Sequence, residues 1–285
     1  MFTSFLGLWL TSFLAAEYQT ILGFCLIFSF GILHGANDMA LISRLERHKN
    51  ISFLKIVTIY IVLVVVSVVF FIKVPILALL FFIFISAYHF GEQNWIKLLK
   101  NCNTIISTLF QFSYGFLILT SLFYFNTQEV TEIIFKIAQI DLDKSLFPII
   151  LIISLVIYIV LALFIIKYFT LSPTMLFEQS FYVLVLCIIF KVASLFLGFA
   201  IYFIFWHSIP SLYDQIKFLY GSYSIANFKK YFKSAFFYWL ISLVGVFGLY
   251  YISKDLLIFD ALFFSFLASI TFPHFIIMLK MYNRD

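Results

Sequence analysis

Charged residues are scarce in this sequence of 285 residues. Asp, Glu, Lys and Arg make up 11% of it and hydrophobic residues 64%, whereas a soluble domain has roughly 25% charged residues. There is no internal repeat and no low-complexity tract. The net charge of +5 is spread over loops, which is not the pattern of a nucleic-acid-binding protein. These absences exclude an ordinary soluble domain and predict an integral membrane protein.

Cysteine pairs and an N-terminal basic region are also missing. The three cysteines have no CxxC spacing, so neither a disulfide framework nor a structural zinc site is indicated. Residues 1–16 are apolar, but no Lys or Arg precedes Arg44, and a secretory signal peptide begins with a basic region. We interpret the start of the chain as a short segment that lies in the membrane or at its interface.

The sequence does contain a series of apolar runs of about 20 residues, the length that crosses the hydrocarbon core of a bilayer. They predict an all-α fold, a polytopic transmembrane helix bundle of about nine spans that follows the short N-terminal segment. Short linkers between them predict a single membrane domain over residues 1–285. The predicted spans are 20–43, 52–72, 75–96, 104–125, 147–169, 173–190, 193–213, 231–252 and 256–279.

The distribution of basic residues orients these spans. When the linker after the first span is placed in the cytoplasm, thirteen of the 18 Lys and Arg residues fall on the cytoplasmic side and five on the other. Membrane proteins concentrate Lys and Arg in cytoplasmic loops. We therefore expect a protein of a bacterial inner membrane with its C-terminus in the cytoplasm.

Histidine is rare, and its placement is uneven. Of the five histidines, His48 lies in a basic linker and is expected to be solvated. The other four lie in spans that run in the same direction, each five to ten residues before the predicted cytoplasmic end. At a rise of 1.5 Å per residue they share one depth within roughly 8 Å. These four are His34, His89, His207 and His274.

Polar side chains inside a membrane are costly and indicate function by default. Four imidazoles at one depth could bind one metal ion, if their helices are neighbours, and imidazole suits iron, zinc, copper and nickel. Other readings remain open: each histidine could be hydrogen-bonded structure, or two pairs could bind haem. Membrane desaturases need about eight histidines in dense clusters, and the sequence has no such cluster.

Three carboxylates follow these histidines at spacings that place them on the same helix face. They lie four residues after the first histidine, three after the second and seven after the third. Because ligating histidines usually donate their second N–H to a carboxylate or carbonyl, they are candidate supports for the ligands, although a place at the lipid headgroups would also explain them. The three are Asp38, Glu92 and Asp214.

Two aromatic residues directly precede ligand candidates, namely Tyr88 before His89 and Trp206 before His207. They could line a cavity for an apolar ligand or anchor the protein at the membrane interface. Aromatic residues reach 22% of the chain, with 41 Phe. Such an excess is typical of lipid-facing helices and also suits a tunnel for a long apolar substrate.

At these motifs the chain resembles the Brp/Blh family of membrane β-carotene 15,15′-dioxygenases. The resemblance implies an Fe(2+) enzyme that uses O₂ to split the central double bond of β-carotene into two retinals, with His34, His89 and His207 as iron ligands. Membrane lipid would surround it, and retinal could pass to a microbial rhodopsin. The motifs, in the family's order, are His34-Gly35-Ala36-Asn37-Asp38, Tyr88-His89-Phe90-Gly91-Glu92, Trp206-His207-Ser208 and Pro273-His274.

One position departs from the family. Many members carry another histidine four residues after the Trp-His motif, and here that position is Ser211, a poor iron ligand. Either His274 completes the ligand set or the site is altered. The alternative function is a membrane protein that binds carotenoid or retinal without catalysis, through a degenerate metal site.

Overall fold

A computed structural model describes residues 13–46, 52–99, 102–169, 172–253 and 259–282. These residues form helices and no strand, and eight of the helical runs are long and apolar enough to cross a membrane. The predicted all-α membrane fold is confirmed. The eight runs are α4 (Phe53–Lys73), α5 (Pro75–Trp95), α6 (Thr104–Phe125), α8 (Leu146–Tyr168), α9 (Pro173–Val192), Leu195–Tyr220, α12 (Ile225–Ser253) and α13 (Phe259–Tyr282).

The first predicted span, 20–43, differs from the other eight because it is interrupted. It consists of α2 (Ala16–Leu26), the π-helix η1 (Ile27–Gly31), a turn that ends at Asn37, and α3 (Asp38–Leu45). Gly and Asn are poor helix formers, and the Asn37 side chain bonds to a distant backbone carbonyl. The interruption falls on the first histidine motif, so His34 lies in a turn and not in a regular span.

Two predicted linkers are partly helical. The linker 126–146 contains α7 (Thr127–Ala138). The linker 214–230 shortens to residues 221–224, between α11 (Ile209–Tyr220) and α12. Gly221 ends α11 with φ 83°, a left-handed conformation that glycine adopts without steric cost at the end of a helix. The run Leu195–Tyr220 begins with α10 (Leu195–Tyr202) and the π-helix η3 (Phe203–Ser208), and α11 follows them.

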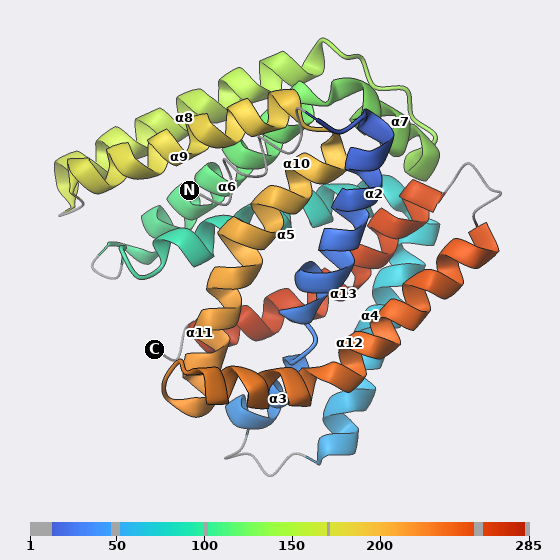
Figure 1. The fold of residues 1–285 in the computed structure, drawn as a ribbon. Coiled ribbons are helices and arrows are strands. Elements are labelled where there is room, and N and C mark those ends of the chain that lie inside the picture. The colour runs from blue at the N-terminus through green and yellow to red at the C-terminus, as the bar shows by residue number, and fades with distance from the viewer. Residues whose placement is uncertain (1–12, 47–51, 100–101, 170–171, 254–258, 283–285) are drawn as a thin grey trace. The chain divides into compact units, whose positions relative to one another are not determined.

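The chain forms two compact units, which are described separately. Unit 1 contains the described residues of 1–24, 83–135 and 139–202. In it α6 packs against α8, α9 and α10 (Figure 1). The crossing of α5 and α6 is very close, because a Cβ added at Gly91 would lie 1.7 Å from the carbonyl oxygen of Gln111, and one at Gly115 would lie 1.9 Å from that of Ala87.

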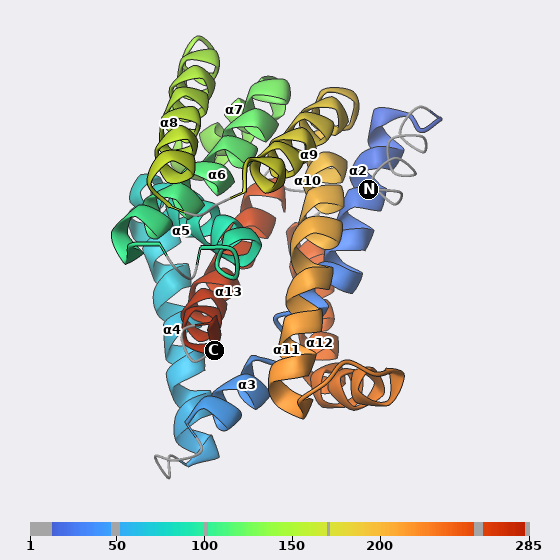
Figure 2. The same cartoon turned by 90° about the vertical axis from the view of Figure 1, so that its left-hand side faces the viewer.

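Unit 2 contains the described residues of 25–82, 136–138 and 203–285. In it α13 packs along α4, and α3 contacts both of these helices (Figure 2). A buried cluster of Leu33, Ile216, Tyr231 and Ala235 joins the turn after η1 to α11 and α12. Three of the four predicted ligand positions lie in this unit.

Candidate metal centre

Unit 2 brings three of the predicted histidines together. The ring of His34 lies 5.2 Å from that of His207 and 4.9 Å from that of His274, measured between centroids, and it is nearly perpendicular to both. All three side chains are buried. They come from the turn after η1, from η3 and from α13, so segments far apart in the sequence supply them.

Two π-helices create this arrangement. His207 lies within η3, and His34 follows η1 by three residues. π-helical turns are rare, occur often at functional sites, and re-aim the side chains of a helix. Phe203, at the start of η3, stacks on His207 at 5.4 Å and meets the edge of His34 at 5.4 Å. It also packs on Gly31, where an added Cβ would lie 2.8 Å from its ring.

A side chain of α12 bonds to backbone carbonyls of η1. The indole N–H of Trp239 on α12 donates to the carbonyl of Ser29 at 2.9 Å and lies 3.3 Å from that of Phe28. Buried backbone acceptors are costly without a partner. Trp239 therefore stabilises the irregular turn that carries His34.

The tautomer of His34 follows from its contacts. Its Nδ1 lies 2.5 Å from the carbonyl oxygen of Gly31, and a carbonyl only accepts, so Nδ1 carries the proton and donates. The lone pair of the neutral ring is then on Nε2. A histidine that ligates a metal through Nε2 usually donates its other N–H in this way.

Asp38 supports a different histidine from the one predicted. His274 Nδ1 donates to Asp38 Oδ1 at 2.7 Å, whereas His34 uses the Gly31 carbonyl. Residues 34–37 form a turn and not a regular helical segment, so the helical spacing between His34 and Asp38 does not apply here. The second oxygen, Oδ2, accepts a hydrogen bond from the Tyr60 hydroxyl at 3.0 Å. Asp38 is therefore bonded at both oxygens.

A second polar network fixes the turn itself. Tyr231 on α12 donates from its hydroxyl to Gln215 Oε1 at 2.7 Å, and the same hydroxyl lies 3.1 Å from the backbone carbonyl oxygen of His34. The side-chain amide of Asn37 donates to the Tyr231 carbonyl at 2.9 Å. Gln215 Nε2 in turn donates to Ser211 Oγ at 3.1 Å. Ser211 thus belongs to the network that holds the turn.

The remaining candidates are placed as follows. His89, Glu92 and Tyr88 lie in unit 1, where His89 and Glu92 are buried and the Tyr88 hydroxyl donates to Glu92 Oε1 at 3.2 Å. Asp214 is half-buried and accepts a hydrogen bond from Tyr282 at 3.4 Å. Trp206 is half-buried on η3. Their roles stay predictions, and His48 lies outside the described residues.

The two ring separations from His34 match those of imidazoles bound to one metal ion. Two rings bound at about 2.1 Å to one ion, at angles of about 90° to 110°, have centroids about 4.6 to 5.3 Å apart, close to the separations from His34. Across the described ranges, no group of three or more His, Cys, Asp or Glu side chains is already arranged to hold a metal ion.

The sequence profile of the beta-carotene 15,15'-dioxygenase family matches residues 25–282. The chain belongs to this family. The match begins before the His34 turn and ends at the last residue of α13, so it includes all three histidines of unit 2 and His89. Neither the curated proteins nor the solved structures contain a match to the chain. Membership in the dioxygenase family confirms the resemblance that the four histidine motifs carry.

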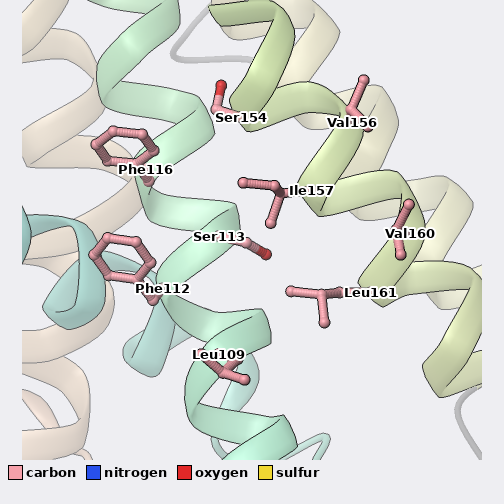
Figure 3. Close-up of a pocket in the computed structure, with 9 residues that line it drawn as sticks. All are labelled: Leu109, Phe112, Ser113, Phe116, Ser154, Val156, Ile157, Val160 and Leu161. Carbon is pink, nitrogen blue, oxygen red and sulfur yellow. The ribbon is translucent and has the colours of Figure 1, made fainter. Parts of the chain in front are cut away.

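Unit 1 of this dioxygenase-family chain has an apolar groove of about 460 Å³ between α6 and α8 (Figure 3). Its two hydroxyls are bonded within the protein, Ser113 to the Phe110 carbonyl and Ser154 to Thr120 Oγ1. The groove contains no titratable side chain, so it suits hydrocarbon. Its lining consists of Leu109, Phe112, Ser113, Phe116, Ser154, Val156, Ile157, Val160 and Leu161.

Sequence reasoning missed the residues that hold the histidine turn, chiefly Tyr60, Gln215, Tyr231 and Trp239. The sequence could have indicated Tyr60, because it is the only tyrosine in the apolar run that forms α4. The other three lie on α11 and α12 at positions where the sequence gives no indication of a partner. Apart from the Gln215–Ser211 bond, which spans four residues, their contacts in this network span 16 to 211 residues along the chain, beyond the reach of spacing rules.

Proposed function

We propose that this protein is an iron-dependent β-carotene 15,15′-dioxygenase that cleaves the central double bond with O₂. The C15=C15′ bond breaks, each carbon gains one oxygen atom of O₂, and two molecules of retinal form. Family membership supports the substrate class and the reaction type. The observation that supports a particular site for the reaction is the buried group of His34, His207 and His274.

His34, His207 and His274 would hold Fe(2+) in this proposal, and His89 stays a predicted further ligand. Bound iron would supply the one-electron chemistry that activates O₂. Gly31 and Asp38 fix the Nδ1–H of His34 and His274, so each ring presents Nε2 in a set orientation. Burial of all three rings excludes bulk water from the reacting atoms. Ser211 is not needed, because His274 stands beside His34.

The apolar surroundings suit a polyene that is already dissolved in the bilayer. β-Carotene has no polar group, so it is selected by shape and hydrocarbon contact alone. The apolar groove between α6 and α8 shows that the chain has a surface that hydrocarbon can contact. Tyr88 and Trp206 stay predicted wall residues, next to His89 and His207 in sequence.

Expression in a bacterium that accumulates β-carotene tests the activity. Loss of the orange colour with formation of retinal is the expected result. Each histidine is then replaced with alanine and the iron bound to the purified protein is measured. His34→Ala, His207→Ala and His274→Ala should lose iron and activity, and so should His89→Ala if it is a ligand. His48→Ala is the matched control and should keep both.

A non-catalytic carotenoid-binding protein is the second candidate. The observation that favours it is Ser211, which replaces a histidine common in the family and is tied to Gln215. The same experiment separates the two functions. If colour persists and carotenoid co-purifies with an iron-free protein, the dioxygenase proposal is wrong.

A further inference from the structure

Tyr60 lies on α4, a mostly apolar helix in which it is the only tyrosine. Its hydroxyl donates to Asp38 Oδ2 at 3.0 Å. α4 packs against α3 and α13, which carry Asp38 and His274 respectively. A tyrosine on one helix therefore reaches a carboxylate on a second helix, and that carboxylate holds a histidine on a third.

The two hydrogen bonds to Asp38 have different effects. The bond from His274 Nδ1 at 2.7 Å fixes the direction of the imidazole ring. The bond from Tyr60 fixes the carboxylate, because with both oxygens engaged it cannot turn about its Cβ–Cγ bond without breaking one of them. Asp38 itself is buried, so no bulk water is available to replace a lost donor. The orientation of His274 thus depends on a hydroxyl that does not touch it.

We propose that Tyr60 is a positioning residue of the metal centre, which acts on His274 through Asp38. This inference rests on the proposed function, because it takes His274 as a ligand. Removal of a residue that is hydrogen-bonded to a metal ligand typically lowers metal affinity by about 10- to 100-fold. Tyr60 is one hydrogen bond further from the His274 ring than Asp38 is. We therefore expect its removal to weaken metal affinity by about tenfold, the lower end of that range.

Replacement of Tyr60 with phenylalanine removes only the hydroxyl. Tyr60→Phe should release iron to a competing chelator at about tenfold lower chelator concentration than the unmodified protein. Tyr158→Phe is the matched control, because Tyr158 is a buried membrane tyrosine whose hydroxyl bonds Ser180 at 3.0 Å in unit 1. It should retain iron as the unmodified protein does. Equal iron release by the two variants would overturn the inference.

A double-mutant cycle tests the route through Asp38. Asp38→Asn should weaken iron retention by itself, and adding Tyr60→Phe to it should have little further effect, since the carboxylate that Tyr60 holds is gone. Additive effects would show that Tyr60 acts by another route and would overturn the inference. The proposed function fails separately: in that case the unmodified protein binds no iron, or His274→Ala retains it.

Discussion

Ser211 and His274 are the residues on which the ligand assignment depends. Ser211 is fully buried, and its hydroxyl accepts a hydrogen bond from Gln215. His274 is 4.9 Å from His34 between ring centroids and is oriented by a carboxylate. A ligand needs a lone pair aimed at the ion, and an imidazole held at Nδ1 provides one at Nε2. At the scale of single residues, the proposed ligand set therefore includes His274 and leaves out Ser211.

The first prediction concerns Ser211. Ser211→Ala should leave bound iron unchanged, because the hydroxyl serves Gln215. It should lower the free energy of unfolding by about 1 kcal/mol, the typical value of one hydrogen bond. Metal analysis and thermal unfolding of the purified variant measure the two effects. Loss of iron in this variant would place the serine among the ligands.

At the scale of elements, two π-helices lie at or next to the clustered histidines, and a close helix crossing holds α5 against α6 in unit 1. η1 and η3 re-aim His34 and His207, and these two elements contact one another. In unit 1, α5 and α6 approach so closely that only glycine fits at Gly91 and Gly115. Small residues permit such contact between membrane helices, where packing replaces the hydrophobic effect. Gly91 also lies two residues after His89, so the crossing sets the position of that histidine within unit 1.

A glycine comparison tests this crossing. Gly115→Ala should destabilise the protein by about 1 to 3 kcal/mol, the usual cost of overpacking, because the added methyl would meet the Ala87 carbonyl oxygen. Gly245→Ala on α12 is the matched control, since nothing lies within 4 Å of its added Cβ. Thermal unfolding in detergent measures both variants. Similar unfolding temperatures would contradict the close crossing.

At the scale of the whole molecule, the proposed metal binding would be linked to stability. The three clustered histidines come from the turn after η1, from η3 and from α13. An ion bound by all three would therefore join segments more than 200 residues apart in the sequence. An ion that binds only the folded state stabilises it by about 2.7 kcal/mol when its concentration is 100 times the dissociation constant.

The corresponding prediction is an iron-dependent unfolding temperature. Added Fe(2+) should raise the unfolding temperature of the purified protein, and a chelator should reverse the change. His274→Ala should show no such increase. An equal increase in that variant would mean that the ion binds elsewhere.

The membrane class, eight of the spans and the histidines that cluster in unit 2 were all predicted from local features of the sequence. Apolar length and the rarity of histidine are local signals, and each can be read without knowledge of neighbours. The interruption of the first span at the His34 turn could not be read in this way, because the apolar run continues through η1. The spacing of four residues also paired Asp38 with His34, but that spacing brings two side chains together only where the backbone is helical.

Tertiary structure alone decided which groups meet. Asp38 bonds a histidine 236 positions away, and Tyr231 reaches the carbonyl of His34 across 197 positions. Such contacts depend on how helices pack, and packing is set by the close fit of many side chains at once. Composition and spacing therefore identified the ligand candidates, whereas only the folded chain showed that Tyr60, Asp38 and His274 form one hydrogen-bonded series.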